Sequence, residues 1–173
     1  VAYCTYAGEI AKRRSRNVRD LAARAGVWVG EMQTTAQRFD PSKSVSFWQT
    51  DSGGQFVAGG RHGQFVGEGF HFICCDDLFK DLAESLSTLV QEEAWNVVKM
   101  LFARLEPGGT LLLTNQRWGE DDPIGKLKEW SATDPDAPEV TLITLRAIED
   151  IQIEEDEQGH ERIVGGKPLC PWR

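Results

Sequence analysis

Three patterns are missing from this sequence, and each absence excludes a class of protein or site. There is no GxxxxGK motif followed by Ser or Thr, which excludes a complete phosphate-binding loop of that type within these residues. No apolar run approaches the roughly 20 residues that a membrane-spanning helix needs, and no CxxC pair occurs among the four cysteines. We therefore expect a soluble, cytosolic protein whose cysteines are small core residues, without a structural metal site or a disulfide framework.

Charge is unevenly distributed along the chain. The net charge of -8 argues against the body of the chain being a nucleic-acid cradle, because phosphate contacts need clustered Lys and Arg. An acidic stretch spans residues 149–161, whereas a basic run lies near the start of the chain. A solvated surface is the default interpretation of both runs, and a binding role is the alternative. The basic run includes Lys12, Arg13, Arg14 and Arg16.

Apolar periodicity and turn signals predict an alternation of strands and helices in a single domain with its own core. A polar, irregular segment with a turn at 40–42 and a glycine-rich loop at 59–69 separate some of the elements. A helix between two apolar strands forms a βαβ unit, so the last two strands should be parallel. The predicted elements are a strand at 1–6, a helix at 7–25, a hairpin of strands 44–49 and 55–58, a strand at 70–75, a helix at 82–105 and a strand at 110–114.

Asp76 and Asp77 directly follow the apolar strand at 70–75. Ligand sites in α/β proteins lie at the carboxyl ends of parallel strands, and two acids there can hold Mg²⁺ and orient a water molecule. The alternative is that they cap the following turn or helix. Since the next strand should be parallel, its trailing residues should lie at the same edge. The expected cluster is Asp76, Asp77, Asn115, Gln116 and Arg117.

The order of these features resembles the ATPase domain of the large terminase subunit of tailed bacteriophages, the motor that drives DNA into the empty capsid. The similarity covers nearly the whole chain. The first two similar segments are the strand and basic helix YCTYAGEIAKRRSRNVRDL (3–21) and the Gly-Gly hairpin with the glycine-rich segment that leads to FICCDD (48–81). The third contains the helix, the Pro-Gly-Gly turn and the strand that ends in Arg-Trp (83–127). The fourth is LRAIED…GGKPLCPWR (145–173).

The resemblance implies a fold and a domain organisation. The implied fold is α/β, a three-layer P-loop NTPase-like structure of the ASCE type with a mostly parallel sheet and flanking helices, incomplete at its N-terminus. Residues 1–145 would be the part of the ATPase domain that holds the Walker B and coupling motifs. Residues 146–173 would be an acidic linker at the end of the ATPase region, leading to a nuclease domain. Because the chain opens at Val1 within a strand, we expect it to be a piece of a longer protein.

The resemblance also implies roles for single residues. Asp76 would help to hold Mg²⁺ and Asp77 would polarise the attacking water, although many terminases have Glu at the second position. Ring motors of this kind use an arginine from a neighbouring subunit, and Arg61 is the candidate in this chain. The coupling motif would comprise Thr114, Asn115, Gln116 and Arg117, and a salt bridge from Arg117 to Asp121 or Asp122 is the alternative for that side chain.

The implied substrate is ATP with Mg²⁺, and the implied partners are double-stranded DNA, the portal protein and the small terminase subunit. The full-length protein would form a homo-oligomeric ring at the procapsid portal in the host cytoplasm, with no membrane contact. Without a phosphate-binding loop, this segment alone should neither bind ATP well nor hydrolyse it. Two other functions remain open: a non-catalytic viral assembly module that docks on portal or small terminase, and a helicase-type ATPase fragment.

Overall fold

The computed structural model describes residues 1–27, 45–50, 52–63, 65, 67–145, 148–155 and 161–168. The predicted turn at 40–42 and the closing residues 169–173 lie outside these ranges. The chain divides into two compact units, 1–137 and 138–173.

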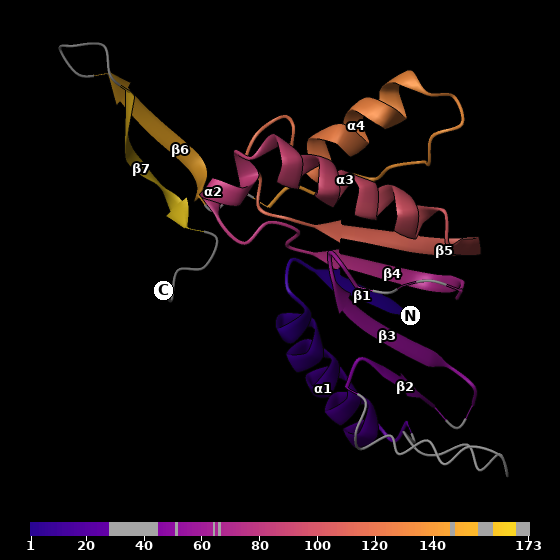
Figure 1. Cartoon of the computed structure of the whole chain (residues 1–173). Coiled ribbons are helices and arrows are strands. Elements are labelled where there is room, and N and C mark those ends of the chain that lie inside the picture. The colour runs from indigo at the N-terminus through magenta and orange to yellow at the C-terminus, as the bar shows by residue number, and fades with distance from the viewer. Residues whose placement is uncertain are drawn as a thin grey trace, which may run out of the picture. The chain divides into compact units, whose positions relative to one another are not determined.

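A five-stranded sheet forms the centre of the first unit (Figure 1). Its order is β2-β3-β1-β4-β5, and every neighbouring pair is parallel except β2 with β3. This arrangement confirms the prediction of an α/β fold with a mostly parallel sheet, including the hairpin and the parallel βαβ pair. The strands are β1 (Ala2–Thr5), β2 (Phe47–Gln49), β3 (Gln55–Gly60), β4 (Phe70–Asp76) and β5 (Leu105–Thr114).

Helices flank the sheet on both faces (Figure 1). Helix α1 (Gly8–Arg24) packs against β1 and β3. Helix α3 (Thr88–Phe102) lies on the opposite face and contacts β5 and α4 (Pro123–Thr133). The carboxyl ends of β1, β3, β4 and β5 meet at one edge, because these four strands are parallel.

The predicted single helix at 82–105 is wrong in two respects. The segment forms a short helix α2 (Leu82–Ser85) and then α3, since Ser87 begins a new helix and the Gln91 side chain donates to the Ser85 carbonyl at 2.6 Å. Strand β5 begins at Leu105, five positions before the expected strand.

The Pro-Gly-Gly sequence lies inside β5, where the register to β4 shifts. A proline is tolerated there because it lies at this irregularity, where the ladder between β4 and β5 is interrupted.

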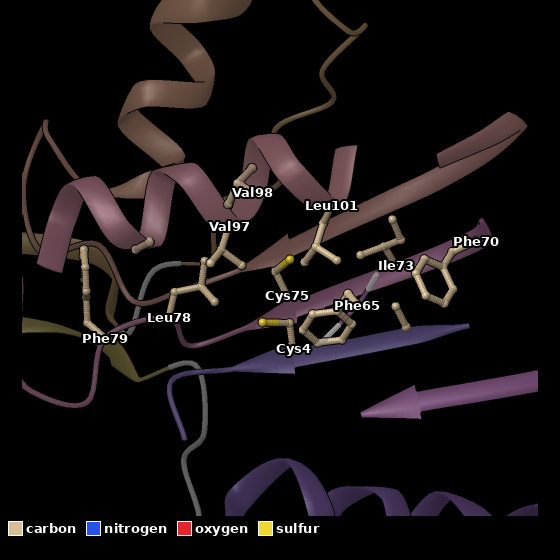
Figure 2. Close-up of a cluster of buried hydrophobic side chains, with 12 residues drawn as sticks. Cys4, Phe65, Phe70, Ile73, Cys75, Leu78, Phe79, Val97, Val98 and Leu101 are labelled. Atoms are coloured by element: carbon tan, nitrogen blue, oxygen red, sulfur yellow. The ribbon is translucent and has the colours of Figure 1, made fainter. Parts of the chain in front are cut away.

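The main core lies between the sheet and α3 (Figure 2). Cys4 and Cys75 are fully buried in it, as predicted for small core residues, whereas Cys74 is only half-buried. Burial raises the pKa of all three thiols. Phe65, from the glycine-rich segment, closes the core beside Cys4 and is 1% exposed. A second cluster under α1 contains Trp48, whose indole donates to Ser15 at 3.0 Å. Cys170 lies outside the described residues.

Gly60 marks a close approach between the end of β3 and the start of α1. A Cβ atom at this position would lie 2.6 Å from the backbone nitrogen of Gly8 and 3.0 Å from the carbonyl carbon of Ala7. Gly60→Ala should therefore lower the free energy of unfolding by about 2 kcal/mol, measured by urea denaturation. Gly119→Ala is the control, because nothing lies within 4 Å of its added Cβ. Equal midpoints for the two variants would contradict this packing.

The second unit contains a hairpin of β6 (Ile148–Glu155) and β7 (Glu161–Pro168), which pair antiparallel. These two strands were not among the elements predicted from the sequence. Lys167 forms an exposed ion pair with Asp150 at 3.6 Å. In the described ranges of both units, no helix combines the length and apolar character needed to cross a membrane.

Candidate functional site at the carboxyl edge of the sheet

Asp76 ends β4 and is held from both neighbouring strands. The sheet register places Thr114 of β5 opposite Asp76, and Tyr3 of β1 opposite Cys74. The Thr114 hydroxyl donates to Oδ1 of Asp76 at 3.0 Å, and the Tyr3 hydroxyl donates to Oδ2 at 2.6 Å. Each oxygen of this half-buried carboxylate therefore accepts one hydrogen bond and keeps a further acceptor position.

Tyr3 remains a proton donor in this arrangement. Burial raises the pKa of Tyr3 above its ordinary value, and the hydrogen bond to Asp76 and the charge of that carboxylate raise it further. A phenol next to an ionised carboxylate stays protonated because a second negative charge would repel the first. The contact is a short hydrogen bond between a neutral donor and a charged acceptor.

Asp77 turns the backbone out of the strand. Its φ of 46° lies in the left-handed region, which Asp and Asn adopt more readily than other side chains. Its carbonyl accepts from the Tyr6 N–H at 3.0 Å and the Thr5 hydroxyl at 3.2 Å, and its own N–H donates to the Thr114 carbonyl at 2.9 Å. The backbone is thus fixed at three points while the side chain is exposed. This geometry gives a physical reason for a short acid at the second position.

The four residues from the end of β5 onward, 114–117, differ in their contacts. Thr114 contacts Asp76, and Gln116 is exposed close behind it in the chain. Both amide atoms of Asn115 are buried and have no hydrogen-bond partner among the described residues. Arg117 donates from Nε to Asp122 at 2.8 Å and from Nη2 to the Gly119 carbonyl at 2.8 Å. The sequence alternative of a salt bridge to Asp122 is therefore confirmed for Arg117.

Asp122 organises the turn that follows β5, a role that the sequence analysis did not single out. It is 2% exposed and accepts from the N–H groups of Trp118 and Gly125 at 3.0 and 2.9 Å, the latter as the N-cap of α4. Burial alone would raise the pKa of Asp122. The hydrogen bonds from Gly125, Arg117 and Trp118 outweigh burial, however, and hold the pKa below its ordinary value. The Asp-Pro pair at positions 122–123 was the available signal, since Pro favours the first turn of a helix.

Arg61 lies at the end of β3 and is largely buried, with 7% of its side chain exposed. Its Nη1 donates to the Leu78 carbonyl at 2.7 Å and to Glu84 at 2.8 Å. Although burial acts in the opposite direction, hydrogen bonds from Arg61 and from the Lys80 N–H keep the pKa of Glu84 below its ordinary value. Arg61 therefore supports the segment that follows the two acids.

Replacing Arg61 with methionine should destabilise the chain by about 2 kcal/mol, because Glu84 and the Leu78 carbonyl lose their donor. The measurement is the urea midpoint, with the exposed Arg13→Met as control. An unchanged midpoint for Arg61→Met would contradict the supporting role and favour a role toward a neighbouring subunit.

The basic residues of α1 point largely to solvent. Lys12 pairs with Glu9 at 2.7 Å, one turn earlier in the helix. Arg13, Arg14 and Arg16 are exposed. Their guanidinium groups are thus accessible to an anionic partner.

The site fits a cation that arrives with its own oxygen ligands. No group of three or more His, Cys, Asp or Glu residues forms a metal cage within the described ranges. Mg²⁺ is commonly bound by one or two carboxylates together with water and substrate phosphates, and Asp76 and Asp77 supply that share. A cavity of about 640 Å³ lies beside β3, lined in part by Gly60 and His62, but neither acid belongs to its lining. We assign the candidate site to the two acids rather than to this cavity, because the pairing of β4 with its neighbours places them at the carboxyl edge of the sheet.

Comparison with known proteins gives no family model that matches this chain and no match among curated proteins.

Proposed function

We propose that this chain is the central part of an ATP-hydrolysing DNA-packaging motor with a P-loop NTPase-like fold. The main support is the position of Asp76 at the carboxyl end of a parallel strand inside the sheet, with its carboxylate oriented by hydroxyls from both neighbouring strands. Asp77 follows at the same edge with an exposed carboxylate and a fixed backbone. This is the arrangement needed for one acid to bind a cation and the next to orient water.

The roles of the residues follow from these contacts. Bound Mg²⁺ would neutralise phosphate charge during transfer to water. Asp76 would hold the cation in one orientation, while Asp77 would accept a hydrogen bond from the attacking water. Thr114 contacts Asp76 through its side chain and Asp77 through its carbonyl. A shift of β5 would thus be transmitted to both acids, which is the property required of a coupling motif.

The free side of β5 provides a place for the phosphate-binding part. Within the described sheet, β5 pairs only with β4. Leu112 and Phe72 lie on one face of these two strands and are 44% and 39% exposed. An apolar edge strand with an uncovered face is suited to receive another strand and helix. We propose that a parallel strand with a phosphate-binding loop pairs here, so that its loop reaches the edge where Asp76 lies.

The DNA partner is proposed for α1, where Arg13, Arg14 and Arg16 are exposed. The test is ATP hydrolysis by the complete gene product that contains this chain, with and without double-stranded DNA. We expect Mg²⁺-dependent hydrolysis that DNA stimulates, and weaker stimulation when the three arginines are replaced by glutamine. Stimulation that is unchanged in the triple variant would remove α1 from the DNA path.

An assembly module is the second candidate, favoured by an exposed apolar group on α2 and α3. Leu82, Leu86 and Leu89 are 54%, 71% and 65% exposed. Leu82 lies in α2, Leu86 follows its end and Leu89 lies in α3, and exposed apolar side chains of this kind can form a docking surface. A complete gene product that binds portal or small terminase but does not hydrolyse ATP would support this function over the motor.

A further inference from the structure

The hydroxyl of Tyr3 joins β1 to the acid at the end of β4. Tyr3 and Asp76 are 73 positions apart in the chain and meet because β1 pairs with β4. The distance of 2.6 Å is that of a strong hydrogen bond to an ionised carboxylate. Thr114 holds the other carboxylate oxygen from the opposite side. The Asp76 side chain is thus fixed between two strands.

Packing alone does not account for the Tyr3 hydroxyl. The ring is partly buried against the cluster under α1, and a phenylalanine ring would fill the same space. Asp76 is only half-buried at a strand end, where water could satisfy its oxygens. The hydroxyl therefore has a separate effect, which is to restrict the orientation of the carboxylate.

We propose that Tyr3 is a positioning residue for a divalent cation at Asp76. Tyr3 and Thr114 each occupy one acceptor position on a different carboxylate oxygen, and the remaining positions are left to the cation. The inference rests on the proposed function in one respect, that Asp76 is a metal ligand. It adds a residue from a different strand that determines how well the acid performs this role.

The chain offers a matched pair of variants, because Tyr3 and Tyr6 are its two tyrosines. Tyr3→Phe removes the hydroxyl that contacts Asp76 and keeps the ring. Tyr6→Phe makes the same chemical change at a residue whose contact to the acid pair is through its backbone N–H. Thr114→Val removes the second hydroxyl that donates to Asp76.

The test measures the binding of Mn²⁺ to the chain from the relaxation rate of water protons. Mn²⁺ is used in place of Mg²⁺. We expect about tenfold weaker binding in Tyr3→Phe and in Thr114→Val, and unchanged binding in Tyr6→Phe. Urea midpoints measured alongside should change little for Tyr3→Phe. This control is needed because a general loss of structure would also weaken Mn²⁺ binding. If Tyr3→Phe is poorly folded, the test of Tyr3 is the spectroscopic measurement that follows, in which Tyr3 stays in place.

A spectroscopic measurement on the folded chain gives an independent result. With 3-fluorotyrosine incorporated, the two ¹⁹F resonances can be assigned using Tyr6→Phe. Mn²⁺ should broaden the Tyr3 resonance first, and excess Mg²⁺ should reverse the effect.

Asp76→Asn separates the two hypotheses. If it binds Mn²⁺ as well as the unmodified chain does, Asp76 is not a ligand and the metal role in the proposed function fails. If Asp76→Asn loses binding while Tyr3→Phe retains it, only the positioning role of Tyr3 is overturned. If the unmodified chain binds no Mn²⁺ at millimolar concentration, the same variants are compared in the complete gene product with ATP, and no Mn²⁺ binding there would overturn both.

Discussion

Asp77→Asn in the complete gene product should lower the rate constant of ATP hydrolysis by about 100-fold or more, while nucleotide affinity stays within a few-fold. The exposed carboxylate of Asp77 would accept a hydrogen bond from the attacking water, and an amide oxygen is a much weaker base. Asparagine also tolerates the φ of 46° at this position, so the fold should persist. The loss would therefore reflect chemistry rather than misfolding.

The control for this variant is Asp121→Asn, which removes an exposed acid beyond the site. Steady-state hydrolysis and nucleotide binding should be measured for both variants on the same preparations. Undiminished hydrolysis in Asp77→Asn would remove this residue from the mechanism. A parallel loss of nucleotide binding would instead give it a role in holding the substrate.

Asp122→Ala should lower the free energy of unfolding by about 3 kcal/mol, the largest effect on stability that we expect from a single side chain at this edge. The substitution leaves the partly buried N–H groups of Trp118 and Gly125 without this acceptor and removes the carboxylate partner of Arg117. Urea denaturation measures the effect, with the exposed Asp121→Ala as control. Similar midpoints for the two variants would contradict the importance of the Asp122 contacts.

The same residue predicts a pH dependence. The folded-state pKa of Asp122 is held below its ordinary value, so its ionised form is favoured by folding. Its contribution should be complete above the unfolded pKa of about 3.9 and should disappear as the pH falls through the lower folded pKa. The stability difference between the unmodified chain and Asp122→Asn should therefore be largest near neutral pH and shrink below about pH 4. A difference that grows on acidification would contradict this.

The sequence was sufficient to predict the features that depend on local pattern. The apolar run of 70–75 predicted a strand that leads into Asp76 and Asp77, and the following helix predicted its parallel partner. The same run predicted burial on both faces, which is wrong, because Phe72 is 39% exposed. The structure places Asp76 and Thr114 side by side for this reason. Periodicity was less informative for 82–105, because the apolar pattern continues across the break at Ser87 and only the local hydrogen bonds interrupt the helix.

Contacts between distant segments could not be predicted from the sequence. The approach of Tyr3 to Asp76 depends on which strand pairs with β1 and in what register, and neither is encoded locally. Arg61 illustrates the same limit, because its burial against Glu84 depends on the path of the loop after β4. A candidate residue named from its neighbourhood in the sequence can thus acquire a different set of contacts in the fold.

The most direct test of the central claim is the Mg²⁺ dependence of ATP hydrolysis by the complete gene product, compared with its Asp76→Asn variant. If Asp76 holds the cation, the unmodified protein should hydrolyse ATP only with Mg²⁺, and the variant should need at least about tenfold more Mg²⁺ for half-maximal activity. Hydrolysis with the same Mg²⁺ dependence in both proteins, or none in the unmodified protein, would contradict the assignment of this sheet edge as the site of nucleotide hydrolysis.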